Sequence, residues 1–221
     1  GVGARALRPE ALKQTTMKTA TYVRLAHALS WALHPFLLPL YLVAALLLLT
    51  PFGLYPAGVK LYLVWVVVLY ALVIPVLALG VLRSLGRISS YRIDERRERL
   101  LPLAVGTLCF LLCALTLAKI PSAEFLRKCM LAAGCCEAFC LAVSCRWKIS
   151  LHLTAAGAAV AVLGVMNFIG VAGMLLPLAG AILCAGALAS ARLYLGCHNG
   201  MQVLAGFAGG FAVATLAVLF L

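Results

Sequence analysis

Charged residues are scarce in this chain. They make up 11% of its 221 residues, whereas 65% of the residues are apolar. Soluble domains average about one quarter charged and one half apolar residues. The shortage of charge therefore excludes an ordinary water-soluble domain and favours a chain whose solvent is the lipid bilayer.

The sequence also lacks the weak alternation of polar and apolar residues that is typical of a transmembrane β-barrel. It has long apolar runs instead, and about 20 mostly apolar residues in a helix cross the hydrocarbon layer. We therefore predict an all-α, polytopic transmembrane helical bundle with six to seven membrane-spanning helices. Seven candidate spans lie at about residues 25–50, 59–83, 101–119, 127–146, 152–169, 172–194 and 199–220.

The N-terminal segment has no apolar core. Residues 1–16 are polar and basic, so no signal peptide is predicted, and Met17 is a candidate natural start. We divide the chain into a basic tail or extension at residues 1–24 and a single transmembrane domain at residues 25–221.

Acidic residues are especially few, with six Asp and Glu against 18 Lys and Arg, and the net charge is +12. In a soluble protein this excess would suggest nucleic acid as a partner. No basic run is interleaved with aromatic residues here, and basic residues at helix ends are expected to face anionic lipid head groups. We therefore expect membrane lipids, and no nucleic acid, as partners.

None of the nine cysteines belongs to paired CxxC motifs, the spacing typical of a structural zinc site. Most are expected to be small buried apolar residues. The cluster of Cys135, Cys136 and Cys140 is an alternative candidate for a redox or metal device, although no His lies nearby. We predict no metal and no cofactor.

Three polar stretches follow the second, fourth and sixth candidate spans. With that count of spans, all three emerge on the same side of the membrane as the N-terminus. That side carries 14 Lys and Arg, against four on the other side. The positive-inside rule therefore predicts a site that faces the cytoplasm.

The three stretches carry side chains that are suited to bind an anion. Their sequences are YRIDERRERLLP, RWKISLHLT and SARLYLGCHNGMQ. The candidate residues are Arg92 and Arg99 in the first, Lys148, Ser150 and His152 in the second, and Arg192, His198 and Gln202 in the third. Taken alone, an arginine-rich run is typical of a solvated loop, a Ser at a helix start of a cap, and each His of a structural side chain.

Taken together, the stretches predict a phosphate site. Guanidinium groups match phosphate oxygens in bidentate pairs, and Lys148 and Ser150 add donors at a helix start, where backbone N–H groups favour anions. The imidazoles of His152 and His198 can supply a nucleophile and a group that protonates the leaving oxygen. Gln202 follows His198 by four residues, so the two side chains share a helix face.

At these residues the sequence resembles the type 2 phosphatidic acid phosphatase superfamily, whose motifs are K-x6-R-P, P-S-G-H and S-R-x5-H-x3-D. The third motif matches best, because Ser-Ala-Arg ending at Arg192 is followed after five residues by His198 and after three more by Gln202. The second motif keeps its Ser and His but loses its Pro and Gly. In the first, Arg92 and Arg99 keep the spacing, and the proline comes later.

The resemblance covers about residues 85–220 and extends to a bacterial branch of the superfamily. It implies a phosphatase-like transmembrane domain with a six-helix core in the bacterial inner membrane. The implied activity is metal-independent hydrolysis of a lipid phosphomonoester or pyrophosphate through a phosphohistidine intermediate. His198 would be the nucleophile and His152 the acid. The implied phosphate-binding residues are Arg92, Arg99, Lys148, Ser150 and Arg192.

One position departs from the third motif. The family has Asp where this chain has Gln202, which can accept an imidazole N–H but cannot supply a negative charge. In serine proteases, exchange of the orienting Asp for its amide costs about 10⁴-fold in rate. A nearby acid, Asp94, Glu95 or Glu98, is a candidate substitute. The alternative function is a non-catalytic phospholipid-binding or lipid-transport protein on the same scaffold.

Two polar sites lie within the predicted spans. Glu137 is near the middle of the fourth span, where an acid costs about 2.5–3.5 kcal/mol. It is a candidate proton relay or groove-lining residue, or a protonated group bonded to a neighbouring helix, and a proton-coupled transporter is a third functional class. His34 and Pro35 interrupt the first span, which predicts a kink with a hydrogen-bonded His rather than a site.

Overall fold

A computed structural model describes residues 9–90 and 95–221. Every regular element within these ranges is helical, so the all-α prediction is confirmed for them. The elements are α1 (Pro9–Ala32), α2 (Leu38–Leu49), η1 (Pro51–Leu54), α3 (Ala57–Val68), η2 (Leu69–Val73), α4 (Ile74–Ser84), η3 (Arg97–Arg99), α5 (Leu100–Leu117), η4 (Pro121–Ala123), α6 (Glu124–Ser144), α7 (Leu151–Phe168), α8 (Leu175–Tyr194) and α9 (Gly200–Phe220).

Five helical segments in the described part of the chain are long and apolar enough to cross a bilayer. They are Ala57–Ser84, Arg97–Leu117, Leu151–Phe168, Leu175–Tyr194 and Gly200–Phe220. Each coincides with a predicted span to within a few residues. α6 also coincides with a predicted span, but it is more polar than these five because it carries two acidic and two basic residues.

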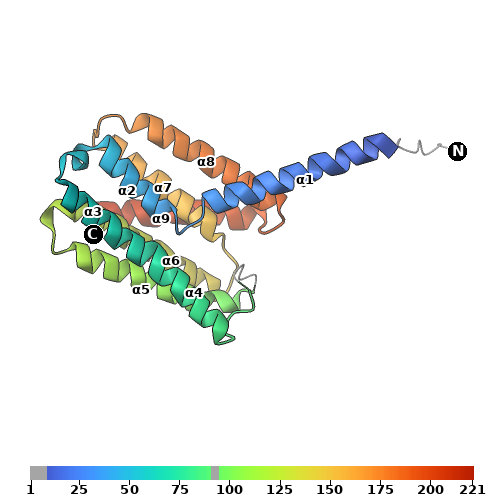
Figure 1. The fold of residues 1–221 in the computed structure, drawn as a ribbon, viewed down its shortest axis with the longest axis horizontal. Coiled ribbons are helices and arrows are strands. Elements are labelled where there is room, and N and C mark those ends of the chain that lie inside the picture. Colours follow the sequence, from blue (N-terminus) through green and yellow to red (C-terminus); the bar gives the residue numbers. More distant parts are fainter. Residues whose placement is uncertain (1–8, 91–94) are drawn as a thin grey trace.

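The first predicted span, residues 25–50, is not one helix. A turn separates the end of α1 from the start of α2, which is only 12 residues long. Pro35 lies in this turn, where it lacks a backbone N–H and disfavours helical backbone at His34 before it. The predicted kink is therefore a complete break, at which the chain changes direction (Figure 1).

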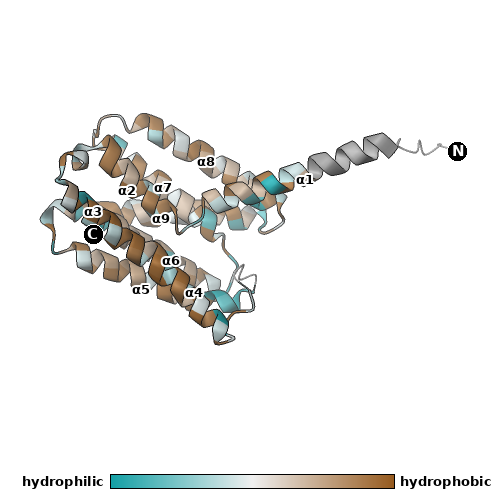
Figure 2. Cartoon of the chain, viewed as in Figure 1, coloured by the Kyte–Doolittle hydropathy of each residue, from teal (hydrophilic) through white to brown (hydrophobic). Residues whose placement is uncertain are grey.

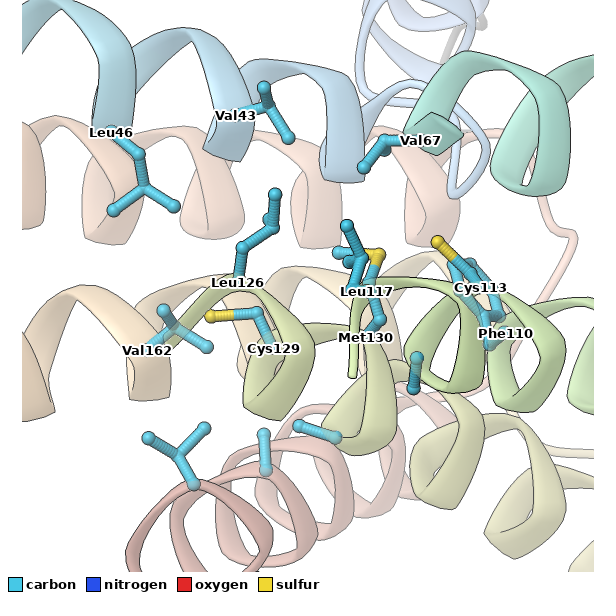
Figure 3. Packing of buried hydrophobic residues seen from close by; sticks show 14 of the residues in the cluster. Val43, Leu46, Val67, Phe110, Cys113, Leu117, Leu126, Cys129, Met130 and Val162 are labelled. Carbon is cyan, nitrogen blue, oxygen red and sulfur yellow. The ribbon is translucent and has the colours of Figure 1, made fainter. Parts of the chain in front are cut away.

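Apolar side chains fill the bundle and also cover its outside. Figure 3 shows Leu46 of α2, Val67 of α3 and Leu126 of α6 in one buried cluster. On the outside, large apolar side chains such as Leu176 and Phe168 are more than four-fifths exposed, at 82% and 87%. Figure 2 shows apolar residues along the helices and polar residues near the end where α4 leads to α5. This distribution supports the prediction of an integral membrane protein.

α7 and α9 make the most extensive helix–helix contact in the described structure. Glycine allows their backbones to approach, because a Cβ at Gly157 would overlap the carbonyl oxygen of Phe207, and one at Gly210 would overlap that of Thr154. Small residues permit this kind of close helix packing in lipid. The contact places the start of α7 next to the start of α9.

Candidate active site

Three connections lie at the same end of the bundle: α4–α5, α6–α7 and α8–α9 (Figure 1). The Arg96 side chain donates to the carbonyl oxygen of Cys145 at 2.6 Å, which joins the first connection to the second. The backbone N–H of Ser150 donates to the carbonyl oxygen of Gln202 at 3.4 Å, which joins the second to the third. The described residues of the three polar stretches therefore lie together, as their order along the chain predicts.

A cavity of about 500 Å³ extends from this end into the bundle. Most of its wall consists of apolar side chains from α2, α4, α5, α6 and α7. The predicted site residues Arg99, His152, Arg192 and His198 all contribute to the same wall. Four functional groups from three separate parts of the sequence thus face one space.

The first turn of α9 sets the orientation of His198. Oε1 of Gln202 accepts the backbone N–H of Asn199 at 3.2 Å, and the Asn199 side chain accepts the backbone N–H of Gln202 at 2.9 Å. This reciprocal capping box holds the Gln202 amide in place. The same Oε1 is 3.2 Å from Nδ1 of His198, and because an amide oxygen only accepts, Nδ1 carries the proton. Nε2 is left with its lone pair, as a nucleophile requires.

The pKa of His198 is lowered to about 4, mainly because the ring is buried. The hydrogen bond to Gln202 raises the pKa, while the positive charges of Arg192, Arg99 and Lys148 lower it further. The imidazole is therefore neutral at neutral pH, which keeps the Nε2 lone pair available.

His152 lies in the first turn of α7, with one ring nitrogen bonded to α1. Its Nε2 is 3.2 Å from the carbonyl oxygen of Ser30, and because that oxygen only accepts, Nε2 carries the proton. To protonate a leaving oxygen, His152 must use Nδ1 or exchange its bond to Ser30. His152, the predicted acid, thus lies on the cavity wall, and its bond to Ser30 limits which ring nitrogen can donate a proton.

His34 is a cavity residue that the sequence interpretation missed. The ring centres of His34 and His152 are 5.3 Å apart, and the rings cross at 82°. Nδ1 of His34 accepts the backbone N–H of Phe36 at 3.3 Å, so the predicted hydrogen bond is present. The sequence signal for this position was Pro35, because a proline makes the backbone before it irregular. Irregular backbone at membrane depth is tolerated where it lines a cavity, as His34 and Pro35 do.

Two guanidinium groups, of Arg99 and Arg192, lie on the cavity wall. Arg99 is only 7% exposed, and its Nη1 is 3.4 Å from the carbonyl oxygen of Ile149. Nε of Arg192 is buried and has no hydrogen-bond partner among the residues that the structure describes. A buried donor of this kind is expected to bind a ligand, and a guanidinium group matches phosphate oxygens.

Two other predicted phosphate-binding residues, Lys148 and Ser150, do not line the cavity. Ser150 is fully buried beside Gly206 of α9, and its hydroxyl neither caps α7 nor finds another partner within the described ranges. Lys148 lies off the wall, although its charge acts on His198. Arg92 lies outside the described residues.

Of the acids predicted as substitutes for the family's Asp, Glu95 and Glu98 are described. Glu98 accepts the backbone N–H and the hydroxyl of Ser89, at 2.9 and 3.0 Å, and so holds the loop before α5. Glu95 is exposed, and Asp94 lies outside the described residues. Among the described residues, Gln202 is the group bonded to the His198 imidazole.

The cysteine cluster packs helices together. Sγ of Cys136 is 3.6 Å from the carbonyl oxygen of Gly210 in α9, and Sγ of Cys140 is 3.3 Å from Oγ1 of Thr154 in α7. Across residues 9–90 and 95–221, no group of three or more His, Cys, Asp or Glu is placed to hold a metal ion. These two thiols act as small side chains that bind α6 to α7 and α9.

Comparison with protein-family models, curated proteins and solved structures finds no match for this chain. Function is therefore inferred from the chemistry of the cavity. Two imidazoles and two guanidinium groups, set in an apolar helical bundle, can bind a tetrahedral anion and transfer protons to and from it.

Proposed function

We propose that this chain is an integral membrane lipid phosphatase of the type 2 phosphatidic acid phosphatase kind that its motifs resemble. The proposed reaction is metal-independent hydrolysis of a lipid phosphomonoester or pyrophosphate through a phosphohistidine intermediate. The observation that carries the proposal is the convergence of Arg99, His152, Arg192 and His198 on one cavity. Displacement at phosphorus requires charge-stabilising donors, a nucleophile and a proton donor, and these four residues supply them.

The composition of the cavity wall favours a lipid as the substrate. Beyond the cationic and imidazole groups, the wall consists mainly of apolar side chains such as Leu42, Leu72 and Val162. A phosphate head group can bind the guanidinium groups while a hydrocarbon tail lies along these side chains. A small soluble phosphate ester would leave this apolar surface without a partner.

In the proposed first step, Nε2 of His198 attacks phosphorus, and a P–N bond forms as the bond to the leaving oxygen breaks. In this step His152 acts in its doubly protonated form: Nε2–H stays bonded to Ser30, and the Nδ1 proton passes to the leaving oxygen. The lipid alcohol is released, or the lipid monophosphate when the substrate is a pyrophosphate. Arg99 and Arg192 stabilise the negative charge on the phosphoryl oxygens. In the second step, water attacks phosphorus, His152 accepts its proton, and cleavage of the P–N bond releases inorganic phosphate.

The test of this function is phosphate release by the purified full chain in detergent micelles, with a chelator present. The substrates are dioleoyl phosphatidate, phosphatidylglycerophosphate and polyprenyl pyrophosphate. We expect release from at least one of them, at a rate that the chelator does not change. A folded protein that releases phosphate from none of these lipids would refute the proposed activity.

We also propose six to seven spans in a bacterial inner membrane, with the site facing the cytoplasm. The 21 residues of α6 extend about 31 Å, which is enough to cross the hydrocarbon layer, and α1 with α2 forms one broken span.

Cys145 is exposed at the polar end of the bundle. A membrane-impermeant maleimide is expected to label Cys145 in inside-out vesicles only, with Cys145→Ser as the control. Labelling in right-side-out vesicles would reverse the orientation.

The second candidate function is phospholipid binding without turnover. The observation that favours it is the pairing of His198 with the neutral amide of Gln202, which cannot offset the positive charge that develops on the imidazole. This candidate predicts that phosphatidate stabilises the protein against heat while no phosphate is released.

Gln202→Asp is expected to raise phosphate release at least about tenfold, because a carboxylate beside Nδ1 stabilises the cationic imidazole. For the same reason it raises the pKa of His198 from about 4 towards its ordinary value. Since the nucleophile must be neutral, the acidic limb of kcat/KM against pH moves to higher pH. The matched control is Gln202→Asn, which has the length of Asp without its charge. Identical rates and pH profiles in the two variants would contradict the prediction.

A further inference from the structure

Glu137 is an acidic group in an otherwise apolar part of the cavity wall. It lies in α6 and is the acid among the described wall residues, and the wall formed by α5 and α6 also contains Phe110, Met130 and the thiols of Cys136 and Cys140. Oε2 of Glu137 is buried and has no hydrogen-bond partner within the described part of the protein. Buried carboxyl oxygens are nearly always hydrogen-bonded. The group therefore requires a partner that these side chains do not supply.

Gly106 of α5 makes room for this carboxyl group. A Cβ at residue 106 would overlap Oε2 of Glu137 and would lie 2.9 Å from its Oε1. Gly106 also follows Arg99 by seven residues, which corresponds to roughly 10 Å along the axis of α5. The carboxyl group thus lies deeper in the cavity than the start of α5, where Arg99 binds the phosphate in the proposed function.

We propose that Glu137 binds a neutral hydrogen-bonding group, a hydroxyl or an ester carbonyl, in the linker between the phosphate and the hydrocarbon tails of the lipid substrate. A carboxylic acid can pair with either group, because it has both a donor and acceptors. This inference rests on the proposed function and narrows it to lipid phosphates of the glycerophospholipid type.

The alternative lipid class is a polyprenyl phosphate. In a glycerol-based lipid, hydroxyl or ester groups follow the phosphate within a few bonds, whereas a polyprenyl phosphate has only hydrocarbon there. Hydrocarbon beside Glu137 would leave the carboxyl group without a partner. Because a buried polar group without a partner is costly, the site discriminates against such a lipid.

The experiment compares two substrates with the full chain in detergent micelles, dioleoyl phosphatidate and a polyprenyl monophosphate. The measured quantity is the ratio of their kcat/KM values. We expect the wild-type protein to prefer phosphatidate and Glu137→Leu to lower the ratio about tenfold, the effect of one lost hydrogen bond. Glu137→Gln keeps the side-chain length and hydrogen-bonding groups, so it retains most of the preference.

Two further variants separate this role from a structural one. Gly106→Ala keeps the carboxyl group but displaces it, because the new Cβ would occupy its position, so we expect the ratio to fall as in Glu137→Leu. Glu124→Gln makes a similar exchange on the exposed first turn of the same helix, where Glu124 pairs with Arg127 at 2.6 Å. This control leaves the ratio unchanged. Thermal unfolding of each variant reports whether it is folded.

Binding of the two lipids can be measured by thermal unfolding even when neither lipid is hydrolysed. Added phosphatidate is expected to raise the unfolding temperature more than the polyprenyl monophosphate does, and Glu137→Leu is expected to remove that difference. Absence of turnover with retained selective binding would overturn the hydrolysis and support the subsite. Equal loss for both lipids in Glu137→Leu, or a wild-type preference for the polyprenyl lipid, would overturn the subsite whatever the outcome for hydrolysis.

Discussion

His198→Ala is expected to lower phosphate release by about 10⁴-fold or more, because removal of the nucleophile of a covalent mechanism leaves only binding and charge stabilisation. The imidazole has the features of a nucleophile: it lines the cavity, it is neutral, and Nδ1 donates to Gln202 so that Nε2 is available. The measurement is the initial rate of phosphate release from the best lipid substrate, together with trapping of the labelled phosphoenzyme. Label that is stable to base and labile to acid, present in wild type and absent in His198→Ala, identifies the phosphohistidine.

The matched control is His27→Ala. His27 lies in α1 and is partly buried, but it does not line the cavity. Its replacement tests whether loss of any imidazole from the bundle lowers the rate. Full activity in His198→Ala, or equal losses in the two variants, would remove the proposed mechanism.

Much of the bundle was predictable because the thickness of the bilayer sets the length of an apolar run. The predicted span 199–220 is α9, Gly200–Phe220, and the predicted span 152–169 is α7, Leu151–Phe168. The same reasoning failed at residues 25–50, where hydropathy is continuous but Pro35 breaks the helix. Hydropathy averaged over a window does not detect one missing backbone donor.

Part of the candidate site was predictable for a topological reason. Arg192 ends one long helix and His198 precedes the next, so they must lie at the same end of the bundle whatever the packing. The same holds for His152 at the start of α7. The same topology places Ser150 at this end of the bundle, but it does not determine the direction of the side chain. Only the packing of α7 on α9 determines that the Ser150 side chain lies against α9 and away from the cavity.

Two contacts of the site depend on tertiary packing that no local pattern encodes. His34 reaches His152 because α1 ends at the level where α7 begins, and the two residues are more than one hundred positions apart. The spacing of His198 and Gln202 predicts a shared helix face, but His198 lies before the N-cap of α9. The capping box with Asn199 holds the Gln202 amide where it can bond the ring. A carboxylate is not needed for that orientation, although it would add charge.

Gly157→Ala is expected to lower phosphate release about a hundredfold and the unfolding temperature by about 5–10 °C. The added Cβ would overlap the carbonyl oxygen of Phe207 and lie 3.0 Å from the backbone nitrogen of Phe211, and backbone atoms in a helix cannot move aside as a side chain can. α7 and α9 must then separate. Because α7 carries His152 and α9 carries Gln202, the partner of His198, their separation also moves the two imidazoles apart.

The control for this prediction is Gly164→Ala, two turns further along the same helix. No atom lies within 4 Å of a Cβ built there, so the same change adds a methyl group without a clash. We expect its rate and unfolding temperature to stay close to those of wild type, since Ala favours a helix more than Gly does. Activity lost in Gly157→Ala but kept in Gly164→Ala would show that the close crossing of α7 and α9 positions the two imidazoles. Equal behaviour of the two variants would mean that the crossing tolerates separation and that the histidines are positioned by other contacts.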